Sequence, residues 1–318
     1  MAEALLESCA SRKPDDLGVP CRRISRTTEE DLETDVRASR RHWLGLPSLT
    51  EVKKAWRGDW SSWFPRIPAE PGFFDAALFQ PTYPPGHRAL SRLSFLVTMD
   101  LIRSLPGASV FDVAAGPCFM AAALHHDGKQ VSVNDLRPTD TALSIWGLSE
   151  TVPRHTADIF SLDPSTTGLF DVVLCAELIE HVAHPRELLH HLRRFLHPGG
   201  HLVVTTPNGA FAGNRLPTLS QVRDLEELEK RQFQPDSDGH LFLLTPAELR
   251  EILEQARFSL VRTILFGVPA VSGFLKFRHL SFLRLPAVWY GFEKLAQVTP
   301  LSLRARVASH MLMCGRSV

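Results

Sequence analysis

The sequence predicts a doubly wound α/β domain, and three observations predict it. Short apolar runs alternate with amphipathic helical stretches from about residue 90 to residue 266. The runs are continuous in Val, Leu and Phe, which is typical of parallel strands covered on both faces. One helical stretch leads into a Pro-Gly-Gly sequence, a common helix stop. Alternation of this kind builds a sheet with helices on both faces.

The individual elements follow from their own patterns. Apolar residues at helical spacing predict a lead-in helix over residues 90–105, and helices are expected at 185–196 and 245–257. Thr245 with Glu248 forms a capping box at the start of the last of these. Strands are expected at 108–114, 130–135, 170–176, 201–206, 258–266 and 310–318, with a further short strand before Asp158.

The flanking segments divide the chain into four parts. We expect a tail and cap over 1–88, a core over 89–266, a helical insertion over 267–309 and a final core strand over 310–318. The cap is rich in proline and in tryptophan, with Trp43, Trp56, Trp60 and Trp63 close together. Two interpretations of these tryptophans remain open, core anchors or part of a lid over a substrate.

Composition narrows the functional class. The 318 residues are 44% hydrophobic and 22% charged, with zero formal net charge, so nucleic acid is not the expected partner. Five scattered cysteines, without a Cys-x-x-Cys pair, predict a reducing compartment rather than a disulfide framework. The N-terminal residues do not read as a signal peptide and no run has the length of a membrane span. A cytoplasmic enzyme is therefore expected.

Three acidic residues follow three successive strands. Asp112 precedes a turn of small residues, Asp135 ends the second strand and Asp158 follows the third. A small-residue turn lets the backbone approach a ligand, and a carboxylate at the second strand's tip suits ribose hydroxyls. Two of these acids also have a structural interpretation, because Asp135 and Asp158 could cap the next turn. The three together favour a nucleoside site.

Residues 170–208 carry the most specific signal: FDVVLCAELIEHVAHPRELLHHLRRFLHPGGHLVVTTPN. This stretch resembles the fourth and fifth motifs of class I S-adenosylmethionine-dependent methyltransferases related to the ubiquinone-biosynthesis O-methyltransferases. The resemblance extends over about residues 90–265. It implies a Rossmann-like, seven-stranded sheet and S-adenosyl-L-methionine as the cofactor.

The resemblance also assigns cofactor-binding residues. It implies that Asp112, Ala114 and Gly116 face the methionine part, that Asp135 with Leu136 binds the ribose, and that Asp158 with Ile159 binds the adenine. Cys175 and Ala176 would line the methionine side opposite. The family's Gly-x-Gly-x-Gly reads here as Ala114, Gly116 and Cys118, so two of its three glycines are replaced.

The acceptor side is predicted from Glu177, Glu180 and His181, just after the fourth strand. A helical turn there would place Glu177 and His181 on one face. Related small-RNA ribose methyltransferases use this set, with a histidine that corresponds to His240, to hold a divalent ion such as Mg²⁺. Three readings remain open: a metal site, a metal-free general base at His181 with Glu177, and a purely structural cluster.

The expected reaction is O-methylation of a small, hydrophobic acceptor in secondary, cofactor or glycan biosynthesis. The alternatives are N- or C-methylation, RNA ribose methylation, and a catalytically silent domain that only binds. Residues 273–296 mix Phe, Leu and Trp with Lys and Arg, which favours either a lid helix or transient contact with an anionic membrane surface.

Overall fold

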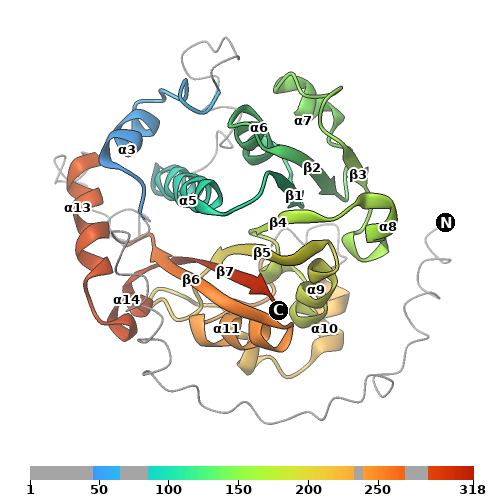
Figure 1. Cartoon of the computed structure of the whole chain (residues 1–318). Coiled ribbons are helices and arrows are strands. Elements are labelled where there is room, and N and C mark those ends of the chain that lie inside the picture. The colour runs from blue at the N-terminus through green and yellow to red at the C-terminus, as the bar shows by residue number, and fades with distance from the viewer. Residues whose placement is uncertain (1–45, 65–84, 233–238, 269–285) are drawn as a thin grey trace.

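Seven strands form one mixed sheet within the part of the chain that the structure describes. This computed structural model describes residues 46–64, 85–232, 239–268 and 286–318, and Figure 1 shows their arrangement. The strand order is β3-β2-β1-β4-β5-β7-β6. The strands β1 to β5 run parallel, whereas β7 is antiparallel to both β5 and β6. The predicted fold class is thereby confirmed. The strand bounds are Ser109–Val113 (β1), Gln130–Asp135 (β2), Arg154–Thr156 (β3), Phe170–Ala176 (β4), Leu196–Pro207 (β5), Phe258–Phe266 (β6) and His310–Ser317 (β7).

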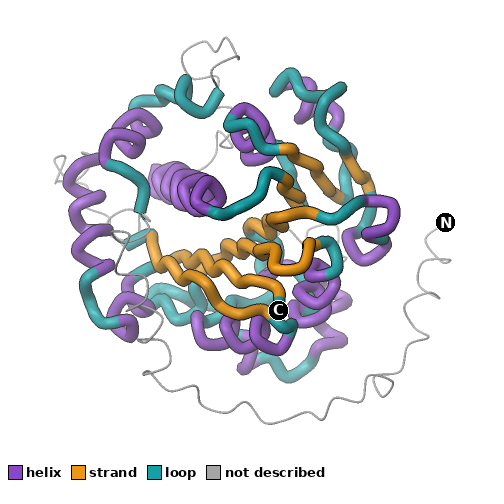
Figure 2. Tube along the Cα trace, in the orientation of Figure 1, coloured by secondary structure: helices purple, strands orange, loops and turns teal. Residues whose placement is uncertain are grey.

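Helices flank the sheet on both sides (Figure 2). On one face α5 and α6 pack together, and α9 and α11 pack on the other. The α-helices are Leu49–Trp56 (α3), Pro85–Ser104 (α5), Phe119–His126 (α6), Asp140–Ile145 (α7), Pro164–Thr167 (α8), Pro185–Arg193 (α9), Leu225–Gln232 (α10), Pro246–Gln255 (α11), Pro286–Gln297 (α13) and Leu301–Val307 (α14). Short 3₁₀ helices span Ile159–Ser161 (η3), Ile179–His181 (η4) and Leu219–Gln221 (η5).

The sheet separates two hydrophobic cores. Successive strand residues point to opposite faces, so Val110 of β1 joins the core beneath α5 and α6 while Phe111 joins the core beneath α9 and α11. Leu174 and Cys175 of β4 divide in the same way. Burial on both faces explains why the strands appear in the sequence as unbroken apolar runs.

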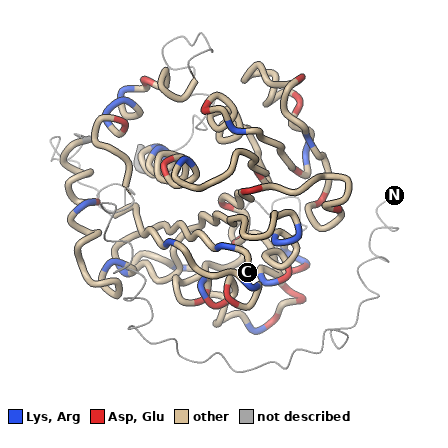
Figure 3. Tube along the Cα trace, viewed as in Figure 1, with Lys and Arg blue, Asp and Glu red and all other residues tan. Residues whose placement is uncertain are grey.

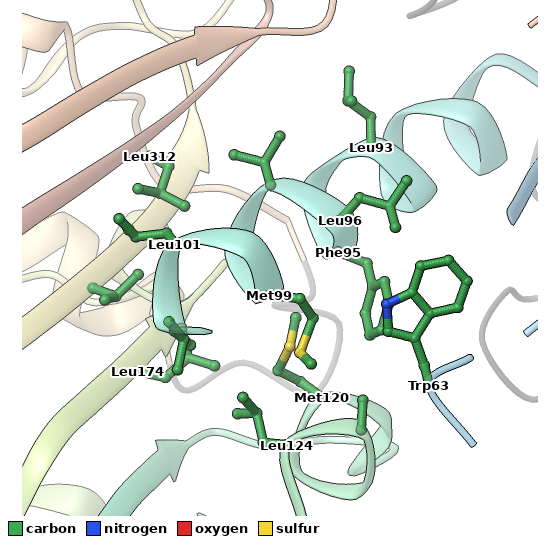
Figure 4. Packing of buried hydrophobic residues seen from close by; sticks show 14 of the residues in the cluster. Trp63, Leu93, Phe95, Leu96, Met99, Leu101, Met120, Leu124, Leu174 and Leu312 are labelled. Atoms are coloured by element: carbon green, nitrogen blue, oxygen red, sulfur yellow. The ribbon is translucent and has the colours of Figure 1, made fainter. Parts of the chain in front are cut away.

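The N-terminal cap contributes to the first core. Along α5, Phe95 and Met99 face a packed layer that includes Trp63 and Met120 (Figure 4). Trp60 and Trp63 are buried, and their rings lie 5.5 and 6.0 Å from the ring of Phe95. These two tryptophans are therefore core anchors. Trp43 lies outside the described residues.

The insertion helix α13 packs against the cap. Trp289 lies 4.2 Å from Trp56, centroid to centroid, and the Tyr290 hydroxyl donates to the carbonyl of Pro47. On the inner side of α13, Glu293 is fully buried and its Oε1 accepts the N–H groups of Gly267 and Val268. The segments that flank the core in sequence are thus in contact in space. Residues 1–45 and 65–84 of the expected tail and cap, and 269–285 of the insertion, lie outside the described residues.

The Pro-Gly-Gly sequence does not end the helix as we expected. Helix α9 stops at Arg193, and Leu196 already pairs with Phe170 at the start of β5. The pairing then jumps to Val172 with His201, so Pro198 to Gly200 form an irregularity within the strand. Gly199 has φ +77°, which glycine adopts without strain. A local strand distortion therefore replaces the predicted helix stop.

Charged residues of both signs occur along the described elements. In the view of Figure 3, Lys and Arg are interspersed with Asp and Glu. Among the described residues, no helix combines the length and the apolarity needed to cross a membrane.

We predict that Trp60→Ala lowers the free energy of unfolding by about 3–5 kcal/mol, because it empties a fully buried aromatic site. Leu303→Ala, at a position that is 49% exposed, is the control and should stay within about 0.5 kcal/mol of wild type. Urea denaturation followed by fluorescence and circular dichroism measures both. A loss below about 1 kcal/mol for Trp60→Ala would show that the cap is not part of the core.

Candidate functional site

Asp112 lies near the carboxyl end of β1 and is buried. Its carboxylate accepts the backbone N–H of Ala121 in α6, while Oδ2 has no hydrogen-bond partner in the protein. Desolvation, with a smaller contribution from the charge of Asp135, raises its pKa to about 7. A buried carboxylate with an unsatisfied oxygen suits a positively charged ligand group, such as the ammonium of a methionine moiety.

The turn after β1 has a backbone conformation that favours glycine, although two of the three glycine positions of the family motif are replaced here. Ala114, Gly116 and Cys118 have φ values of 55°, 49° and 56°, all in the left-handed region. That region costs a non-glycine residue roughly 1–2 kcal/mol. Cys118 is buried in the core, and burial raises the pKa of its thiol to about 12. The substitutions thus leave the loop's conformation in place at a cost in backbone strain.

Asp135 connects the second strand to this turn. Its Oδ2 accepts the N–H of Gly116 at 2.9 Å, and its Oδ1 accepts the N–H of Arg137 at 2.9 Å. Leu136, the next residue, is 71% exposed. Asp135 therefore stabilises the loop at the position where the resemblance implies a ribose contact.

Asp158 and Ile159 lie after β3. The Oδ1 atom of Asp158 accepts the N–H of Phe160 at 3.0 Å and caps η3. Ile159 is buried, and its carbonyl oxygen lies 2.7 Å from Nε2 of His191. Asp158 has the loop-capping role that the sequence left open, and its contact with adenine stays a prediction.

Cys175 and Ala176 end β4 on opposite faces of the sheet. Cys175 belongs to the core beneath α9 and α11, where burial raises its thiol pKa, whereas Ala176 packs toward α5 and α6. A ligand at the edge of the sheet could therefore meet the side chain of Ala176 but only the backbone of Cys175.

Glu177 departs from the helical turn that we expected. Its φ is +50°, and only Ile179–His181 form a 3₁₀ turn after it, so Glu177 and His181 are not one helical turn apart. Its carboxylate is hydrogen-bonded to the side chain of Thr205. Desolvation by the surrounding protein raises its pKa, an effect that solvent moderates because 41% of the side chain is exposed.

Glu180 faces two histidines from inside the protein. Its Oε2 accepts the hydroxyl proton of Thr206 at 2.9 Å, and Oε1 is buried without a hydrogen-bond partner, 3.9 Å from Nε2 of His240. The rings of His181 and His240 are 4.9 Å apart. One ligand atom each from Glu180, His181 and His240 lies within 4.8 Å of the others. The structure therefore brings together three of the four residues expected to hold a metal.

The electrostatics of this group would be balanced by a bound cation. Desolvation raises the pKa of Glu180 well above its usual value, and the neighbouring carboxylate of Glu177 raises it further. Desolvation, with smaller contributions from the charges of His181 and His310, lowers the pKa of His240 to about 4. A neutral His240 is a competent ligand at neutral pH, and a bound cation would relieve the repulsion between the two carboxylates.

His310 belongs to this region although our sequence analysis did not select it. Its Nε2 lies 3.7 Å from Oε2 of Glu177. It begins β7, and an antiparallel strand begins at the edge where its parallel neighbours end. The available signal was a histidine as the first residue of the last predicted strand.

Comparisons with known proteins identify the family of the chain. Residues 88–263, more than half of the chain, match the family model described as a methyltransferase domain. The chain is a class I S-adenosylmethionine-dependent methyltransferase by family. It resembles ubiquinone biosynthesis O-methyltransferases distantly, as the sequence motifs implied.

Two relatives illustrate the distance. The ubiquinone biosynthesis O-methyltransferase of Xanthomonas oryzae pv. oryzae is 30% identical over 159 residues, which cover 49% of this chain and 64% of the relative. The enzyme of the same name from Xanthomonas campestris pv. campestris is 32% identical over 160 residues, with 49% and 65% covered. The chain thus spans just under two thirds of these relatives' length.

Solved structures resemble the chain at lower identity. A methyltransferase from Bacillus halodurans is 20% identical, with 70% of this chain and 98% of that chain covered and a TM-score of 0.42. The geranyl diphosphate C-methyltransferase of Streptomyces coelicolor, solved with Mg²⁺, geranyl diphosphate and S-adenosyl-L-homocysteine, is 12% identical. The coverage is 85% of this chain and 97% of that chain, with a TM-score of 0.45.

We predict that affinity for S-adenosylhomocysteine falls as the pH drops below 7. Asp112, with a pKa of about 7, is protonated below that value and must lose its proton to attract the ligand's ammonium group. Between pH 8 and pH 6 the affinity should fall by about tenfold, because the ionised fraction of a carboxyl with this pKa falls by about that factor. Calorimetry at several pH values measures this change. Asp112→Asn should bind more weakly at pH 8 and lose the dependence, and a dependence that persists in this variant contradicts the assignment.

Proposed function

We propose that the chain transfers a methyl group from S-adenosyl-L-methionine to a hydroxyl oxygen of a small organic acceptor, with a divalent ion held by Glu180, His181 and His240. The observation that carries the metal part is the buried Oε1 of Glu180, which has no hydrogen-bond partner and faces two imidazoles. A buried carboxylate oxygen without a donor is costly unless a cation or a proton satisfies it.

The cofactor side of the proposal is supported by the loop and the acids around it. The loop from Ala114 to Cys118 exposes backbone at the carboxyl end of the sheet, and Asp135 is hydrogen-bonded to its Gly116. We assign Asp112 to the methionine end of the cofactor and Asp135 with Leu136 to the ribose. Asp158 and Ile159 are assigned to the adenine, and Ala176 with the backbone of Cys175 to the methionine side.

The residues present fit a divalent ion. Two imidazoles and a carboxylate are a common donor set for Mn²⁺ or Zn²⁺, and Mg²⁺ would favour more oxygen ligands. When bound, the ion would supply a positive charge that acidifies a coordinated hydroxyl. Glu177 lies outside the group of three that the described residues form, and its carboxylate instead faces His310.

The protein's own task is to orient the acceptor and accept one proton. Methyl transfer is an in-line displacement, so its rate depends on alignment of the acceptor oxygen with the methyl group. The Glu180 carboxylate is held by Thr206, and the Glu180 carbonyl accepts the N–H of Leu241, which fixes His240 beside it. These contacts hold the candidate ligands in place before any acceptor arrives.

The alternatives differ in what they would require. A metal-free mechanism would use His181 as the base and would leave Oε1 of Glu180 without a cation. RNA ribose methylation would need a basic surface, and the charges on the described elements are mixed (Figure 3). A lid formed by the flanking segments, and contact of the insertion with an anionic membrane, stay predictions.

We predict that chelation stops turnover without releasing the cofactor. Wild type should release S-adenosylhomocysteine from S-adenosylmethionine with a hydroxylated aromatic acceptor, and excess EDTA should abolish this release while S-adenosylhomocysteine affinity changes less than about twofold. Readdition of Mn²⁺ or Mg²⁺ should restore turnover.

Binding of the ion can be measured without an acceptor. Mn²⁺ titration followed by electron paramagnetic resonance should show one site that Glu180→Gln and His240→Ala weaken at least tenfold, consistent with loss of one ligand. The exposed His190→Ala is the matched control and should bind as wild type does. Full turnover in EDTA, or equal Mn²⁺ binding in all variants, would remove the metal from the proposal.

A further inference from the structure

We propose that His310 is a further catalytic residue, which accepts the proton of the acceptor hydroxyl through its Nε2 atom. The inference rests on the proposed function, because it assigns the proton that O-methylation must release. It concerns a residue on β7, a strand that carries none of the cofactor or metal assignments above.

Strand register places His310 beside the acceptor residues. Ala176, the last residue of β4, is aligned with Thr205 of β5, and Thr205 is aligned with Leu312 of β7. His310 lies two residues further toward the edge, paired with Pro207. Glu177 extends beyond Ala176 toward the same edge, so the two side chains meet across the end of β5, with Nε2 and Oε2 at 3.7 Å.

The two contacts of the Ser309 hydroxyl indicate which tautomer His310 adopts. The Ser309 hydroxyl has one proton, and it donates that proton to the carbonyl oxygen of Gly267 at 2.8 Å. Nδ1 of His310 lies 3.3 Å from the same hydroxyl oxygen. That contact is a hydrogen bond only if Nδ1 carries the ring proton and donates it. In the neutral ring, Nε2 is then the atom with the lone pair, and it faces Glu177.

A chain of contacts holds Ser309, the partner of Nδ1, in place. Gly267 is fixed on both sides, because its N–H donates to Glu293 of α13 and its carbonyl also accepts the backbone N–H of Ser309 at 3.0 Å. Gly267 has φ +82°, and a Cβ there would lie 2.5 Å from Oγ of Ser309. Only glycine fits, so the approach of Ser309 to Gly267 is built into the backbone. The ring of His310 also packs against Phe266, 6.0 Å between centroids.

In the proposed step, methyl transfer to the acceptor oxygen is coupled to loss of the hydroxyl proton. The acceptor oxygen forms a bond to the methyl carbon as the carbon–sulfur bond of the sulfonium breaks, and the sulfur keeps that electron pair. The hydroxyl proton passes to Nε2 of His310, which becomes an imidazolium. The Glu177 carboxylate, 3.7 Å away, stabilises the new positive charge. The imidazolium returns its proton to solvent after the products leave, since 18% of the side chain is exposed.

The tautomer can be tested without an acceptor. Long-range ¹H–¹⁵N NMR of the full chain, assigned by comparison with His310→Gln, should show a protonated Nδ1 and an unprotonated Nε2 in the neutral ring of His310. Ser309→Ala removes the partner of Nδ1 and should shift the ring toward the Nε2-protonated form. A wild-type ring protonated mainly at Nε2 would overturn the proposal, whatever the enzyme methylates.

Kinetics test the role in proton transfer. With any hydroxyl acceptor that wild type methylates, His310→Ala and His310→Gln should each lower kcat by at least about 100-fold, the usual contribution of a general base. KM for the acceptor and affinities for S-adenosylhomocysteine and Mn²⁺ should stay within about threefold, because none of these depends on a base.

The glutamine variant distinguishes a His310 that accepts a proton from one that only orients Glu177. Glutamine can occupy the position of Nε2 and hydrogen-bond to Glu177, but it cannot accept a proton. Recovery of wild-type kcat in His310→Gln would reduce His310 to a residue that orients Glu177 and would overturn the proposal. If wild type methylates no hydroxyl, the proposed function fails, and the NMR result still decides the tautomer on its own.

Discussion

The shared edge of the sheet is the constraint on which the rest of this structure depends. Parallel strands in register end at one edge, and Asp112, Asp135 and Glu177 reach that edge from β1, β2 and β4. The single antiparallel strand enters from the same side and brings His310. Residues that are almost 200 positions apart in the chain thereby become neighbours. A change in strand register would move these residues apart.

This edge also carries several features that lower the stability of the fold. Left-handed residues at Ala114, Cys118 and Glu177, and buried carboxylates at Asp112 and Glu180, each lower stability. The two hydrophobic cores offset that cost, and one of them extends into the cap through Trp60. Strain and unsatisfied charge of this kind persist where the surrounding structure holds them, and ligands of opposite charge are the groups that would relieve them.

Much of this arrangement could be predicted from the sequence, since it depends on local patterns. The strands and the capping box at Thr245 follow from periodicity and from capping chemistry, and the motif over 170–208 identified the family. Other features depend on three-dimensional contacts. The positive φ of Glu177 and the bulge at Pro198 to Gly200 are set by how β4 and β5 pair. The position of His310 at the site depends on the antiparallel direction of β7 and on the contact between Ser309 and Gly267.

The most direct test of the account is a calorimetric titration of the chain with S-adenosylhomocysteine, alongside Asp135→Ala and the control Asp163→Ala. Asp163 is exposed and caps α8, ahead of β4 and away from the edge. The account predicts micromolar binding to wild type and to the control, and binding at least about tenfold weaker in Asp135→Ala, as expected for loss of a charged hydrogen-bond acceptor. Equal affinity in all three, or no binding to a folded wild type, would contradict the assignment of this edge to the cofactor.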